Sequence, residues 1–188
     1  EYEATKIRWD NSLYMGYGKT KITPSDGGAR RTTENEDKIL ASSDLAYKMW
    51  RLWNSDVGPF GQLAYQTEFT SNDDAPLTKI FRGKGGVKLF NGKYISSLYV
   101  AAVGEYDFTY TDQDNGKFAG EVGLTAKYPL RDGVDFQFDG YYRKYWFYSE
   151  YVSTDLKYDL SVVGRMNVRL FNKFSLAPFV SYRMAKSR

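Results

Sequence analysis

The sequence predicts an all-β protein: an antiparallel up-and-down transmembrane β-barrel formed by one domain over residues 1–188. Three observations predict this fold class. Apolar and polar side chains alternate in strand-length segments from Tyr94 to Tyr182. Short connections rich in Gly, Asn and Asp separate these segments, as tight hairpins require. Aromatic residues make up 18% of the chain and gather toward segment ends, which is typical of the interfacial girdles of outer-membrane barrels.

The alternation is most regular in residues 155–170. Its even-numbered positions are Leu156, Tyr158, Leu160, Val162, Gly164, Met166, Val168 and Leu170. Its odd-numbered positions include Asp155, Lys157, Asp159, Ser161, Arg165, Asn167 and Arg169. Because successive side chains of a strand point to opposite faces, such a segment separates a nonpolar medium from a polar one. A soluble sandwich or lipocalin-like barrel has the same period, but full charges along the polar face favour a wet lumen.

Nine strands are predicted in order, at about 4–20, 38–53, 59–71, 78–90, 94–110, 117–130, 133–147, 155–170 and 173–185. Longer connections, at 23–37, 70–76, 111–116 and 149–154, alternate with shorter ones at 54–58, 91–93, 131–133 and 172–173. Outer-membrane barrels place short turns in the periplasm and long loops outside. Such barrels have even strand counts, so we expect about ten to twelve strands in the intact protein. Either the chain is truncated at one or both ends, or segment 38–53 is misassigned.

Composition excludes several classes of function. The 26 Lys and Arg residues are interleaved with 23 Asp and Glu residues, so nucleic acid is not an expected partner. The chain has no Cys and no His, which removes disulfides, thiolate nucleophiles and histidine general bases. We therefore predict no enzymatic activity, no cofactor and no metal site. An alternative is an enzyme or ligand-binding barrel built on lumen carboxylates such as Asp135 and Asp139.

The charged residues of the polar face are the candidate functional residues, as the lining of a pore or as a plug. They are Arg82, Lys84, Lys88, Glu105, Asp107, Glu121, Lys127, Asp135, Asp139, Arg143, Asp159, Arg165, Arg169 and Arg183. Opposite charges that face one another fill the lumen of a small barrel as a salt-bridge network. The locally basic stretch of Arg82, Lys84 and Lys88 would either line an anion-preferring wall or pair with Glu68, Glu105 or Asp107 on flanking strands.

One predicted strand contains a group of glycines. Gly83, Gly85 and Gly86 lie inside a predicted strand, where we expect them to relieve crowding or let the strand bend.

Short motifs at 9–13, 16–18, 33–38 and 46–48, which begin with Trp9-Asp10-Asn11-Ser12-Leu13, resemble an uncharacterised outer-membrane β-barrel family of Bacteroidota. The Gly-rich upstream strand and the closing downstream strand of that family are absent from this chain. The resemblance implies a location and carries over no catalytic residue.

Together these features predict a protein of the Gram-negative cell envelope, located in the bacterial outer membrane. Its expected partners are the lipid bilayer, lipopolysaccharide and other outer-membrane proteins. The predicted role is structural or interactive, as a subunit of an envelope complex. A narrow porin for small anionic solutes is the main alternative, and the carboxylate-based barrel is the other.

Overall fold

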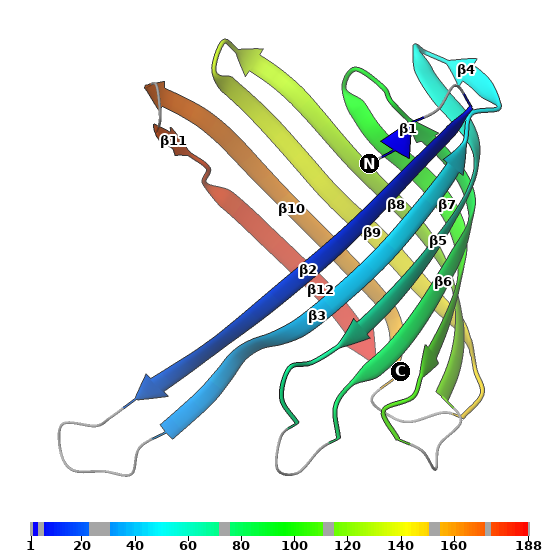
Figure 1. The fold of residues 1–188 in the computed structure, drawn as a ribbon, viewed down its shortest axis with the longest axis vertical. Helices are drawn as coiled ribbons and strands as arrows, with labels where there is room; N and C mark the ends of the chain where they lie inside the picture. The colour runs from blue at the N-terminus through cyan, green and yellow to red at the C-terminus, as the bar shows by residue number, and fades with distance from the viewer. Residues whose placement is uncertain are drawn as a thin grey trace.

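The computed structural model describes residues 2–3, 6–22, 31–71, 76–110, 115–150, 155–171 and 174–187. Within these ranges twelve strands form one sheet, and there is no helix (Figure 1). The strands are β1 (Tyr2–Glu3), β2 (Ile7–Ile22), β3 (Arg31–Tyr47), β4 (Trp50–Leu52), β5 (Ser55–Thr67), β6 (Lys79–Phe90), β7 (Ile95–Asp107), β8 (Asn115–Arg131), β9 (Val134–Tyr148), β10 (Leu156–Phe171), β11 (Phe174–Leu176) and β12 (Phe179–Ser187).

The strand order is that of an up-and-down meander. Strands pair in the order β1-β2-β3-β5-β6-β7-β8-β9-β10-β11, while β12 pairs with β10 and β4 pairs with β5. Every pairing is antiparallel. The prediction of an all-β antiparallel fold is therefore confirmed. Among the described residues β2 and β12 are not paired with each other, so the sheet is open between these two edges.

The predicted strand at 38–53 has the wrong limits. Strand β3 begins at Arg31, and its first residues continue the ladder with β2 through pairs such as Lys21 with Thr32. The side chains there are polar, but the ladder is made by backbone groups and tolerates them. Strand β3 ends at Tyr47, and β4 and β5 then form a hairpin whose central residues, Trp53 and Asn54, both have positive φ (49° and 58°). A two-residue type I′ turn requires this conformation.

The predicted strand at 173–185 is divided into β11 and β12 by Ala177 and Pro178. Proline has no N–H group to donate to the ladder. Its carbonyl still accepts a hydrogen bond, at 3.0 Å, from the backbone nitrogen of Met166. Both β11 and β12 pair with β10, so the interruption at Ala177 and Pro178 does not change the partner of the strand.

The sheet has an inner and an outer face of opposite character. In β7 the side chains of Ala101, Val103 and Glu105 are buried on the inner face, whereas Val100, on the outer face, is 65% exposed. Buried apolar side chains form two small clusters, one of Ala46, Phe60, Phe90 and Ala101 and one of Val103, Ala119 and Tyr145. Large apolar side chains lie mainly on the outer face. In β7 the alternation read from the sequence is therefore confirmed.

Crowding explains one of the glycines of β6 but not another. A side chain at Gly86 would collide with the backbone of Val100 on β7, so this glycine relieves crowding as predicted. A β-carbon at Gly85 would meet nothing within 4 Å, so crowding does not account for that glycine.

The two ends of the sheet differ in their connections. At one end, called here the turn end, β6 connects to β7 and β8 connects to β9 within a few residues. At the other, the loop end, the strands are joined through residues 23–30, 72–75, 111–114 and 151–154, which lie outside the described ranges. The predicted longer connections fall largely on these residues. In the described part of the chain, no helix has the length and apolar character needed to cross a membrane.

Candidate functional site

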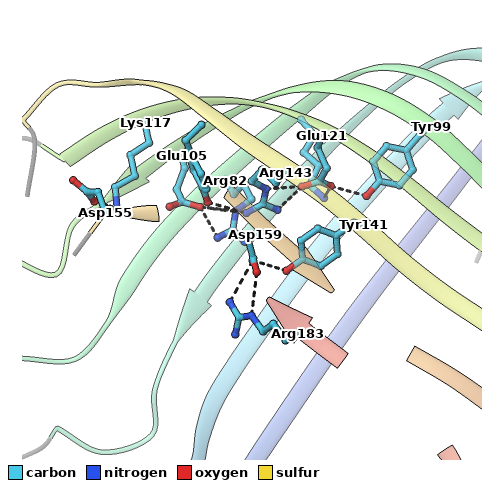
Figure 2. Close-up of polar contacts among 12 residues, drawn as sticks. Arg82, Tyr99, Glu105, Lys117, Glu121, Tyr141, Arg143, Asp155, Asp159 and Arg183 are labelled. Carbon is cyan, nitrogen blue, oxygen red and sulfur yellow. Dashed lines mark hydrogen bonds and ion pairs between the residues drawn. The ribbon is translucent and has the colours of Figure 1, made fainter. Parts of the chain in front are cut away.

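The candidate site is a group of ion pairs on the inner face, called here the Glu121 cluster. It consists of Arg82, Lys84, Glu105, Glu121 and Arg143, which come from the four neighbouring strands β6, β7, β8 and β9 (Figure 2). The alternation of each strand directs these side chains inward. Their exposed side-chain fractions are small, from 16% for Arg82 to 0% for Glu121.

Glu121 lies at the centre of the cluster. Its Oε1 accepts hydrogen bonds from Lys84 Nζ and from the Tyr99 hydroxyl, both at 2.5 Å. Its Oε2 lies 2.5 Å from both Nε and Nη2 of Arg143. One buried carboxylate therefore holds two cations and a phenol, which is the satisfied arrangement that a buried charge requires.

Arg143 connects this centre to Glu105. The Nη1 atom of Arg143 donates to the Tyr145 hydroxyl at 3.1 Å and lies 3.7 Å from Glu105 Oε2. The same Glu105 oxygen accepts from Nε and Nη2 of Arg82, at 2.8 and 2.5 Å. The result is a continuous series of alternating charges across the inner face.

Small inner-face residues allow these long side chains to cross the sheet. Lys84 on β6 reaches Glu121 on β8 across the intervening β7, where the inner-face residues Ala101 and Val103 are short and buried. A side chain at Gly123 would collide with the ring of Tyr99, so glycine here lets that ring lie against β8. The cluster depends on these small residues as well as on its charges.

Three further ion pairs surround the cluster. Asp159 accepts hydrogen bonds from Tyr141 at 2.8 Å and from Nε and Nη2 of Arg183 at 3.1 and 3.3 Å (Figure 2). Lys117 lies 2.8 Å from Asp155. Toward the turn end, Lys88 lies 2.8 Å from Asp44.

The structure places the basic stretch of Arg82, Lys84 and Lys88 on β6 in ion pairs. Arg82 pairs with Glu105, which is one of the partners anticipated from the sequence. Lys84 and Lys88 pair instead with Glu121 on β8 and Asp44 on β3, each two strands away from β6.

Other predicted site residues lie outside the cluster. Lys127 is 57% exposed and lies 3.6 Å from Asp135, which also accepts a hydrogen bond from Asn167. Asp139 accepts from Gln137, and Asp107 accepts from the backbone of Thr109. Arg165 and Arg169 are exposed. Asp135 and Asp139 thus have separate hydrogen-bond donors and do not share one.

Sequence reasoning missed the tyrosines of the site. Tyr99, Tyr141 and Tyr145 lie on the inner face, where each makes a hydrogen bond with a charged side chain. Their odd numbers, in segments whose apolar residues have even numbers, were the available signal. Lys38, which lines the cavity described below, was also missed.

Two cavities adjoin the cluster on the inner face. The larger, of about 660 Å³, is lined by residues of β3, β5, β6, β7, β9, β10 and β12. The smaller, of about 290 Å³, lies toward the turn end and is lined in part by Asp10, Asp44 and Lys88. Both are lined by Ser42, Gln62 and Lys84, so these residues lie between them. The larger cavity is lined by β12, at one edge of the sheet, and by β3, which lies next to β2 at the other edge, so the sheet curls strongly.

No metal-binding group emerges from the geometry. Among the residues that the structure describes, no three His, Cys, Asp or Glu side chains are grouped so that they could hold a metal ion. The carboxylates of the Glu121 cluster, and the neighbouring Asp44, Asp155 and Asp159, are instead held by Lys, Arg and Tyr donors. The chemistry available to this arrangement is electrostatic: it can fill a space, fix the sheet's curvature and attract ions.

Comparison with known proteins adds one similarity. Residues 1–72 match the model of a family described as a protein of unknown function (DUF3078). The matched segment spans β1 to β5 and includes the Trp9-to-Lys48 motifs noted in the sequence. No curated protein and no solved structure matches the chain. The family description names neither a location nor an activity, so the similarity to a Bacteroidota outer-membrane family stays a prediction.

Proposed function

We propose that this protein is an outer-membrane β-barrel of the bacterial envelope with a structural or interactive, non-catalytic role. The observation that carries the proposal is the reversed polarity of the sheet. Glu121 and Arg143 are buried on the inner face, while Leu13 and Val100 on the outer face are 63% and 65% exposed. A soluble protein buries its apolar set and exposes its charges. Lipid around the outer face accounts for the reverse.

Strand length and aromatic placement support the same proposal. The paired strands β5 to β10 have 12 to 17 residues, whereas a tilted strand needs about 9–11 to cross a bilayer. Exposed aromatic residues lie near both ends of the sheet. Trp50 and Trp53 lie at the turn end, and Phe108 and Trp146 lie near the loop end. Such a distribution is typical of two interfacial girdles.

A barrel that spans a membrane needs a partner for the open edges of this sheet, β2 and β12. Unpaired backbone groups are not tolerated in contact with lipid. Strands β2 and β12 run in the same direction, because they are the first and last of nine long strands that pair antiparallel in succession. An additional strand antiparallel to both, or an odd number of them, would close the barrel with an even strand count.

The Glu121 cluster supports a filled lumen rather than an open channel. It lies between two cavities, and Lys84 lines both of them. Paired charged side chains that fill the lumen of a small barrel leave no continuous route for solutes. A protein of this kind would serve as a membrane anchor or as a subunit beside other outer-membrane proteins.

A narrow pore for small anions is the second candidate. The observation in its favour is the basic character of the larger cavity, which is lined by five basic and two acidic side chains. Pores lined by Arg and Lys favour anions.

Two measurements test the proposal. Sedimentation of native membranes, followed by carbonate and detergent extraction, should release the protein with detergent only; a protein that stays in the supernatant without detergent would contradict a membrane location. Reconstitution in planar bilayers should then give no conductance steps. Reproducible anion-selective steps would refute the filled lumen and favour the pore.

A further inference from the structure

The larger inner-face cavity carries more positive charge than its carboxylates neutralise. Its basic lining residues are Lys38, Arg82, Lys84, Arg143 and Arg183, and its acidic ones are Glu105 and Asp159. Glu121 adds a third carboxylate behind the lining, where it holds Lys84 and Arg143. Five positive charges therefore meet three negative ones.

Lys38 is the cation that this pairing leaves over. Arg82 is held by Glu105, and Arg183 by Asp159. In the described ranges, Lys38 has no ion pair within 4 Å, and it lies near enough to Arg82 and Arg183 to be repelled by both. Asp37, which precedes Lys38 on β3, accepts hydrogen bonds from the backbone of Phe69 and Thr70. Glu36, two residues from Lys38, attracts it, but Glu36 also accepts a hydrogen bond from the Tyr14 hydroxyl.

We propose that this cavity binds a small multivalent oxyanion, of the inorganic phosphate type, between Lys38 and Arg183. The two side chains come from β3 and β12, which lie near the two edges of the sheet, and both line the same cavity. Arg183 uses Nε and Nη2 on Asp159 and is 65% exposed, so its remaining donors face the cavity or solvent. An anion bound there would replace the mutual repulsion of the cations with two charge-assisted interactions.

The neutral lining suits an oxyanion as well. Ser42, Gln62, Gln66 and Ser161 offer hydroxyl and amide donors around the same space. A volume of about 660 Å³ accommodates a hydrated phosphate with room for bridging water. The cavity opens on the inner face, opposite the apolar surface, so the ligand is a free anion and not the headgroup of a surrounding lipid.

This inference goes beyond the proposed function, since binding at the inner face requires neither conduction nor a membrane. The test is isothermal titration of the folded full-length chain, in detergent or buffer, with sodium phosphate in a background of sodium chloride. We expect saturable binding. Lys38→Gln and Arg183→Gln should each weaken it by about tenfold or more, the factor that one charge-assisted hydrogen bond contributes. Lys38→Arg, which keeps the charge, should retain binding.

Lys79→Gln is the matched control, because Lys79 is exposed and belongs to the same strand as Arg82. Its phosphate affinity should equal that of the wild type. Circular dichroism and the denaturant midpoint of each variant establish that it is folded. If Arg183→Gln does not fold, because it leaves Asp159 short of a partner, Lys38→Gln decides alone. Absence of saturable binding to the folded wild type, or equal affinity of wild type and Lys38→Gln, would overturn the proposal.

Discussion

Replacing Glu121 with glutamine is the perturbation that bears most directly on the Glu121 cluster. Glutamine has nearly the same shape, so the substitution removes one negative charge and creates no cavity. Lys84 and Arg143, whose side chains are 14% and 7% exposed, would then face each other without their shared counterion. The Tyr99 hydroxyl would retain an acceptor.

The expected cost is large. Removing one partner of a buried, hydrogen-bonded ion pair costs about 3–5 kcal/mol, because the remaining charge stays buried. Here Lys84 loses its ion pair and Arg143 keeps only Glu105, at 3.7 Å, so we expect the free energy of unfolding to fall by at least about 3 kcal/mol. Lys84→Met added to Glu121→Gln should restore part of this loss, since it removes the cation that Glu121→Gln leaves without an ion pair.

The assay is equilibrium unfolding in urea or guanidinium, followed by the fluorescence of the four tryptophans in the folded protein. Glu150→Gln is the matched control: Glu150 is exposed beside the loop end, and its substitution should change the free energy of unfolding by less than about 0.5 kcal/mol. If Glu121→Gln were as stable as the control, the buried ion pairs would not hold the inner face together as described.

Three further predictions use the same assay. Val100→Arg should lower the free energy of unfolding in vesicles by about 2–4 kcal/mol, because Val100 is central in β7 on the outer face; a stable, vesicle-inserted variant would contradict lipid contact there. Gly123→Val should displace the Tyr99 ring and cost about 1–3 kcal/mol, and Tyr99→Ala should recover part of it; additive losses would show that the two residues do not contact. Lys127→Gln should change stability by less than about 1 kcal/mol, because its pair with Asp135 is half exposed and 3.6 Å long; a loss of several kcal/mol would place this pair in the interior.

Most of the strand pattern could be predicted from the sequence, because the period of two is written directly in the side chains. Glu105 and Glu121 are odd-numbered in segments whose even positions are apolar, and both are buried on the inner face. Asn91 and Gly133, in the predicted short turns, have the positive φ that such turns require. Local sequence therefore determines strand existence, face and turn chemistry.

The partners within the site could not be predicted in the same way. Lys84 and Lys88 pair with residues two strands away, and such contacts depend on the stagger and curl of the whole sheet. Register shifts add to this, as between Leu156 and Tyr158 of β10, where the alternation changes phase. The division of the last strand at Pro178 was readable from proline chemistry, but the predicted segment passed over it.

The central claim is that the outer face contacts lipid and the inner face does not. The chain has no cysteine, so single-cysteine variants can be labelled without background. Leu63 and Gln62 are neighbours on β5; Leu63 is 57% exposed on the outer face, and Gln62 lines both inner cavities. With a fluorophore at each position in vesicles of brominated lipid, we predict strong quenching at Leu63→Cys and little at Gln62→Cys. Equal quenching at both positions, or none at either, would contradict the membrane barrel.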